Sequence, residues 1–126
     1  MKLLCMGLGV LLVMLLIGIF LCSMLNTRLD AAVDSLSNAL EAAWGNIFEL
    51  AQEALAQTQE AWDRLYTMAS SVLDHDDLES AELMLSRLTA AAKSGQWEEF
   101  TLQCQELLTL LRQIIRNELP VLENIL

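Results

Sequence analysis

The chain is poor in the residues that interrupt helices and cross-link small folds. Its 126 residues include one proline, five glycines and three cysteines. Cys5 and Cys22 lie in or beside a long apolar run and Cys104 lies on an apolar helical stripe, so the three cannot form a disulfide framework. Alanine, leucine, glutamate and glutamine dominate the remainder, and this composition predicts an all-α protein.

Basic residues are also scarce. After residue 28 the sequence contains five basic and seventeen acidic residues, which gives this part a net charge of −12. A surface of this sign disfavours nucleic acid and simple electrostatic docking on anionic lipid headgroups. We therefore predict no nucleic-acid partner.

One apolar run dominates the N-terminal part. From Leu3 to Leu25 there is no charged residue, asparagine, glutamine or proline. A helix of this length reaches about 34 Å and can cross a hydrocarbon core of about 30 Å. The run is longer than the apolar stretch of a signal peptide and ends without an Ala-x-Ala pattern. A lipoprotein site at Cys22 is disfavoured because Leu21 precedes it. We predict that residues 1–26 form an uncleaved transmembrane anchor.

The charges that flank the run set its predicted orientation. Lys2 and the amino terminus precede it, and Arg28 follows it, so the two flanks nearly balance. The free amine favours the N-terminus in the cytoplasm, with the remainder of the chain outside.

The apolar spacing after the anchor predicts a small antiparallel bundle of three to four helices in residues 27–126. The predicted helices cover residues 27–44, 47–73, 77–93 and 96–119. Gly45 suits the left-handed position that ends a helix, and Asn46 with Glu49 matches a capping box for the next helix. One continuous helix through this junction is the alternative.

Later junctions carry similar signals. Asp76 with Glu79 matches a second capping box, while Gly95 and Pro120 are expected to end the third and fourth helices. Gly45 and Gly95 are each followed by a polar residue, an apolar residue, any residue, glutamate and an apolar residue. A duplicated hairpin of about 50 residues would produce this likeness. Helix-capping preferences alone would also produce it, and we favour that explanation.

Three short features resemble a known family. They are Trp62, the turn Asp74-His75-Asp76 twelve residues later, and the ending Leu122-Glu123-Asn124-Ile125-Leu126. With these features the chain resembles the bacterial family called domain of unknown function 4363. It departs from the family at Ile47-Phe48, where members often carry an Asp-Trp pair. The resemblance implies a single-pass protein of the bacterial cytoplasmic membrane with a helical remainder, and it implies no activity.

Residues of the ligand type concentrate only at Asp74-His75-Asp76-Asp77. An imidazole beside carboxylates can hold a divalent cation or exchange protons. Four consecutive residues cannot all face one ion, however, and aspartates at a helix start cap backbone N–H groups. We favour capping and keep His75, Asp74 and Asp76 as weak metal candidates. No catalytic residues and no cofactor are predicted, so the chain is not expected to be an enzyme.

The stripe formed by Leu29, Val33, Leu36 and Leu40 is narrow and suits a coiled-coil seam. We predict that it is a contact surface for another membrane protein or for a second copy of this chain. The sequence thus favours a membrane-anchored, non-catalytic helical interaction protein without a small-molecule substrate. The alternative is an extracytoplasmic cation- or ligand-sensing domain centred on the Asp74–Asp77 turn.

Overall fold

The computed structural model describes residues 1–117, which form four helices joined by short turns. The helices are α1 (Lys2–Trp44), α2 (Phe48–Val72), α3 (His75–Lys93) and α4 (Trp97–Asn117). This confirms the predicted all-α helical bundle. The predicted helix end at residue 119, the stop at Pro120 and the last family feature lie outside the described residues.

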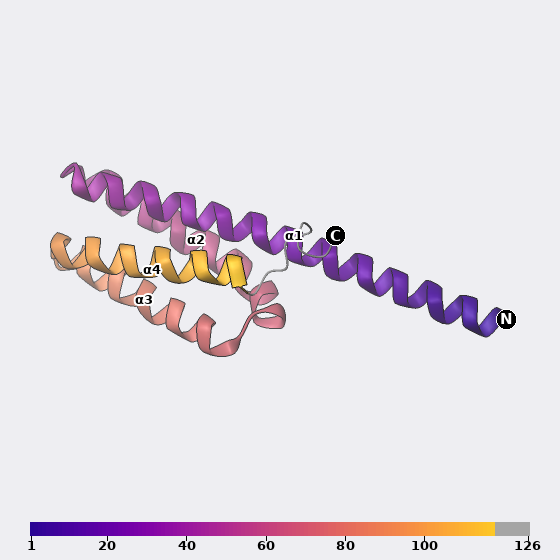
Figure 1. Ribbon diagram of the computed structural model, residues 1–126. Helices are drawn as coiled ribbons and strands as arrows, with labels where there is room; N and C mark the ends of the chain where they lie inside the picture. The colour runs from indigo at the N-terminus through magenta and orange to yellow at the C-terminus, as the bar shows by residue number, and fades with distance from the viewer. Residues whose placement is uncertain (118–126) are drawn as a thin grey trace.

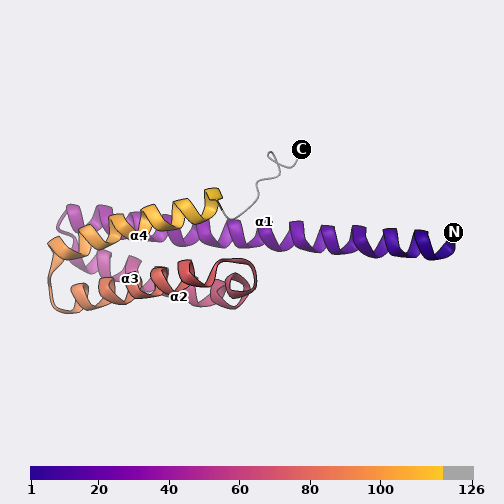
Figure 2. The same cartoon turned by 60° about the horizontal axis from the view of Figure 1, so that its bottom comes forward.

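Helix α1 continues without a break through the boundary predicted between residues 26 and 27. No glycine or proline lies between Ile19 and Trp44, and Thr27 Oγ1 donates a hydrogen bond to the Ser23 carbonyl within the helix (3.0 Å). Nearly all large apolar side chains before Leu25 are exposed, whereas Leu25 is fully buried. The first half of α1 therefore projects beyond the other three helices (Figures 1 and 2).

The second half of α1 and the other helices form an antiparallel bundle. Helix α1 packs on α2 and α4, and α3 packs on α4 and less closely on α2. The largest fully buried side chains include Leu29, Leu36, Leu65, Leu88 and Phe100. Burial of one such side chain contributes about 1.5–3 kcal/mol, so the bundle is held mainly by this shared apolar core.

The break predicted between the first two bundle helices is confirmed, but its chemistry differs from the prediction. The Ile47 N–H donates to the Ala42 carbonyl (2.9 Å) and the Asn46 N–H to the Ala43 carbonyl (3.1 Å), which is a Schellman ending. Asn46 has φ +60°, whereas Gly45 has φ −82°. The left-handed residue is therefore Asn46, and the prediction for Gly45 was wrong.

Both predicted capping boxes were also wrong. Helix α2 has Ile47 at its N-cap and no side-chain cap, because Asn46 is used to end α1. Helix α3 begins at His75, two residues before the predicted start, because Asp74 is its N-cap. Asp74 Oδ1 accepts a hydrogen bond from the Asp76 N–H (3.2 Å).

The turn between α3 and α4 repeats the turn between α1 and α2. The Gln96 N–H donates to the Ala91 carbonyl (2.9 Å) and the Gly95 N–H to the Ala92 carbonyl (3.3 Å). Gly95 ends α3 with φ +72°, as predicted. It is the structural counterpart of Asn46, at an offset of 49 residues (95 − 46). Gly45 and Gly95, which match by letter, are therefore not equivalent in the structure.

The same offset relates the cores of the two hairpins. Buried Leu29, Leu36, Ala43, Leu55 and Leu65 of the first hairpin correspond to buried Leu78, Leu85, Ala92, Cys104 and Ile114 of the second. Capping preferences act only at helix ends, so they do not explain a core repeated at one constant offset. Hairpins α1–α2 and α3–α4 are therefore two structural repeats, which corrects our preference for capping alone.

The first helical residues of α2 and α4, Phe48 and Trp97, join the repeats at the far end of the bundle, away from the apolar half of α1. Their rings stack with centroids 4.5 Å apart and an interplanar angle of 11°. The Trp97 ring also meets the edge of Phe100 at 5.2 Å. Aromatic pairs of this kind add about 0.5–1.5 kcal/mol beyond burial.

Replacing Asn46 by glycine tests the left-handed ending. We expect Asn46→Gly to raise the free energy of unfolding by about 0.5–1 kcal/mol, because glycine adopts positive φ without a Cβ penalty. The measurement is urea unfolding of the full chain in detergent, followed by circular dichroism. The control Asn38→Gly makes the same exchange inside α1 and should lower stability. A loss of stability in both variants would contradict the assignment.

Candidate functional site

The predicted interaction stripe lies inside the bundle. Leu29 and Leu36 are fully buried, Leu40 is nearly so, and Val33 is partly buried against the core. The stripe is wider than leucine spacing alone suggested, because alanines such as Ala32 also lie in the core. This face of α1 packs on α2 and α4. Its assignment as a surface for an outside partner was therefore wrong.

The Asp74–Asp77 turn starts helix α3. Asp74 caps the helix, and His75 Nε2 lies 3.0 Å from Glu79 Oε1 one turn later, with both side chains well exposed. Residues 1–117 contain no group of three His, Cys, Asp or Glu side chains placed to hold a metal ion. The arrangement of His75, Asp74 and Asp76 is accounted for by helix initiation, and nothing in it favours the sensing hypothesis.

Cys104 is fully buried in α4. Desolvation raises the pKa of its thiol to about 12, so the group stays neutral near pH 7. A neutral buried thiol is a poor nucleophile and packs as a small apolar side chain.

Exposed apolar residues occur instead around the turn where α1 ends and α2 begins. This turn lies at the end of the bundle away from the apolar half of α1 (Figure 1). Trp44, Ile47 and Leu50 are 58%, 55% and 49% exposed, and we call these three residues the apolar tip. Ile47 and Leu50 line a shallow groove between α1 and α2 with Glu41 and Glu53. This groove has a volume of about 440 Å³.

Acidic side chains surround the apolar tip. Glu41, Glu49 and Glu53 are exposed there, and the ion pairs found within residues 1–117 involve other acids, Glu60 and Glu79. The tip therefore combines an apolar centre with uncompensated negative charge. Ile47 and Leu50 fit the apolar spacing of the predicted helix 47–73, and that spacing is typical of core positions, so the sequence does not distinguish them as a surface. The two tight turns instead bring Phe48 against Trp97 and leave Ile47 outside.

Comparison with models of protein families assigns the chain to one family. The family model described as "Domain of unknown function (DUF4363)" matches residues 19–125. The chain belongs to the DUF4363 family. The resemblance inferred from Trp62 and the Asp74–Asp76 turn is thereby confirmed.

The DUF4363 match begins within the apolar half of α1 and continues through α2, α3 and α4. Its N-terminal limit thus lies before the first buried residue of the bundle, Leu25. Comparisons with curated proteins and with solved structures give no significant match.

Proposed function

We propose that this DUF4363 protein is a non-catalytic interaction protein anchored in the bacterial cytoplasmic membrane by the first half of α1. The observation that carries the proposal is the continuity of α1. Within residues 1–117 it is the one helix long and apolar enough to cross a membrane. The exposed apolar side chains before Leu25 need an apolar environment. From Leu25 onward, the apolar side chains of α1 that face the other helices are covered by the bundle.

The structure of the boundary favours an anchor over a cleaved signal. A cleavage near Ser23 would cut within one turn of Leu25 and Leu29, which are fully buried. The cut would fall inside a regular helix rather than in an extended segment. Lys2 and Arg28 nearly balance, and the free amine favours an N-terminus in the cytoplasm, with the bundle outside.

The apolar tip is the proposed contact surface. Its partner would be another membrane-associated protein that presents an apolar side chain surrounded by lysine or arginine, because such a surface complements Glu41, Glu49 and Glu53. A second copy of this chain offers the same acids at its own tip, so contact between two tips would be repulsive. The proposal therefore commits to a different, basic partner.

Site-directed photo-crosslinking in intact membranes tests this proposal. A photoreactive residue at Trp44 should give one discrete adduct, and Ile47→Gln with Leu50→Gln should reduce its yield about tenfold or more. The control pair is Leu83→Gln with Leu102→Gln, since these leucines are equally exposed (54% and 53%) and lie outside the tip. Raised ionic strength should also weaken the adduct.

The identity of the adduct decides the outcome. An adduct with a protein whose cross-linked surface is basic supports the proposal. Equal losses in the tip and control variants, an adduct of this chain with itself, or no adduct would overturn it.

A further inference from the structure

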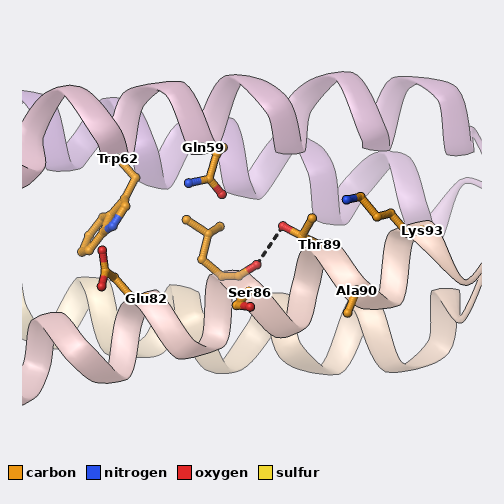
Figure 3. A pocket seen from close by; sticks show the side chains of 8 residues that line it. Gln59, Trp62, Glu82, Ser86, Thr89, Ala90 and Lys93 are labelled. Carbon is orange, nitrogen blue, oxygen red and sulfur yellow. Dashed lines mark hydrogen bonds between the residues drawn. The ribbon is translucent and has the colours of Figure 1, made fainter.

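The two repeats pack together along two seams, which would be alike if the repeats were identical. Helix α1 packs on α4 along one seam, and α2 faces α3 along the other, where the packing is sparser. The α2–α3 seam opens into a groove of about 570 Å³ (Figure 3). This volume falls in the range typical of ligand sites. The open seam is therefore a departure from the repeat.

The offset of 49 residues shows which side chains differ between the α1–α4 seam and the α2–α3 seam. In the α1–α4 seam the equivalent positions are held by Leu108, Val33 and Leu40, which are buried or partly buried. In the α2–α3 groove they are held by polar residues, Gln59, Glu82 and Thr89 respectively. Three apolar residues of the closed seam thus have polar counterparts in the open one. Hydrophobic packing does not explain a groove lined in this way.

One buried donor in the groove wall has no acceptor among residues 1–117. The Trp62 side chain lines the groove and is 4% exposed, and its Nε1–H has no acceptor within the described residues. Thr89 Oγ1, by contrast, donates to the Leu85 carbonyl at 3.0 Å. An unpartnered buried N–H is costly. This indole N–H can therefore donate to an acceptor on a bound molecule.

Opposite charges mark the two ends of the groove. Glu82 lies beside the Trp62 indole, and Lys93 lies at the other end (Figure 3). They are eleven residues apart on α3, which corresponds to about 16 Å along the helix. This distance equals about five residues of extended peptide. A free amino acid is too short to reach both charges.

We propose that the α2–α3 groove binds an extended peptide segment, with a basic group at Glu82 and a carboxylate at Lys93. A peptide carbonyl accepts from Trp62 Nε1, and the Gln59 amide pairs with a peptide group, for which it has both a donor and an acceptor. This site is separate from the apolar tip, so the test of peptide binding does not depend on the proposed function.

The test follows the indole N–H signals by nuclear magnetic resonance of the full ¹⁵N-labelled chain in detergent. The probe is a library of five-residue peptides with lysine first, varied uncharged residues in the middle and a free carboxyl terminus. The signal of Trp62 should shift and saturate, while those of Trp44 and Trp97, which lie outside the groove, serve as internal controls. A library with glutamate first and an amidated C-terminus should bind at least about fivefold more weakly.

Two variants complete the test. The exchange Glu82→Lys with Lys93→Glu should reverse the preference between the two libraries. The closed-seam variant Gln59→Leu, Glu82→Val and Thr89→Leu takes its residues from the α1–α4 seam and should stay folded, with no shift of the Trp62 signal. No Trp62 shift in the unmodified chain, an unchanged preference after the charge exchange, or an undiminished shift in a folded closed-seam variant would overturn the proposal. If the closed-seam variant unfolds, Trp62→Phe takes its place. Peptide binding should then be lost, and it is followed by the backbone N–H signals of the two residues that flank position 62.

Discussion

Leu36→Asp is expected to unfold the bundle. Leu36 is fully buried on the face of α1 that packs against α2 and α4. The substitution removes a core side chain, which costs about 2–5 kcal/mol, and it places a carboxylate where no partner is available. The total is a large fraction of the 5–15 kcal/mol that stabilises a typical domain. Circular dichroism of the full chain in detergent should show lost helicity and no cooperative thermal transition.

Asn38→Asp is the matched control for this substitution. It introduces the same negative charge two residues later in α1, at an exposed position. Surface substitutions of this kind change stability by about 0.5 kcal/mol or less. A folded Leu36→Asp variant that has lost a binding partner would instead restore the view that this stripe is an outward contact surface.

Deleting residues 2–24 is expected to move the protein from the membrane fraction to the soluble fraction. Residues 2–24 contain thirteen leucine, isoleucine, valine and phenylalanine residues. Each contributes about 0.3–0.6 kcal/mol to insertion, which gives roughly 4–8 kcal/mol in total. The shortened chain keeps Leu25 and every later core residue, so it should retain the cooperative thermal transition of the bundle.

The full chain provides the comparison for the deletion. It should resist extraction from membranes by salt and alkaline washing, and its intact mass should include the N-terminal segment. A full chain recovered in the soluble fraction would contradict the anchor. A membrane or secreted form that begins after residue 20 would identify the segment as a cleaved signal.

Helix positions were predictable because leucine and alanine spacing follows burial closely. In the predicted helix 96–119, for example, Phe100, Leu107 and Ile114 recur every seven residues, and all three are buried. The residue that ends each helix was harder to predict. Glycine is the better left-handed residue, yet Asn46 takes this role beside Gly45. The reason lies in the tertiary structure, since this register places Phe48 opposite Trp97.

The surfaces were harder to predict than the helices. A stripe such as Leu29–Leu40 looks the same in sequence whether a helix of the same chain or a separate protein covers it. The α2–α3 groove depends on which helices become neighbours, and that pairing follows from both turns together. Trp62 packs in the core, as is usual for an aromatic residue at helical spacing among apolar ones, but its unpartnered Nε1 becomes visible only in three dimensions.

The unbroken course of α1 has a mechanical consequence. From Leu25 to Trp44 the helix rises about 30 Å, with no glycine, proline or turn at which it could bend freely. If the first half spans the bilayer, the apolar tip is held at a nearly constant height of about 30 Å above it when the helix stands upright. A tilt of the segment in the lipid would swing the tip sideways as one rigid body. Partners would thus be selected by the height of their docking surface as well as by its chemistry.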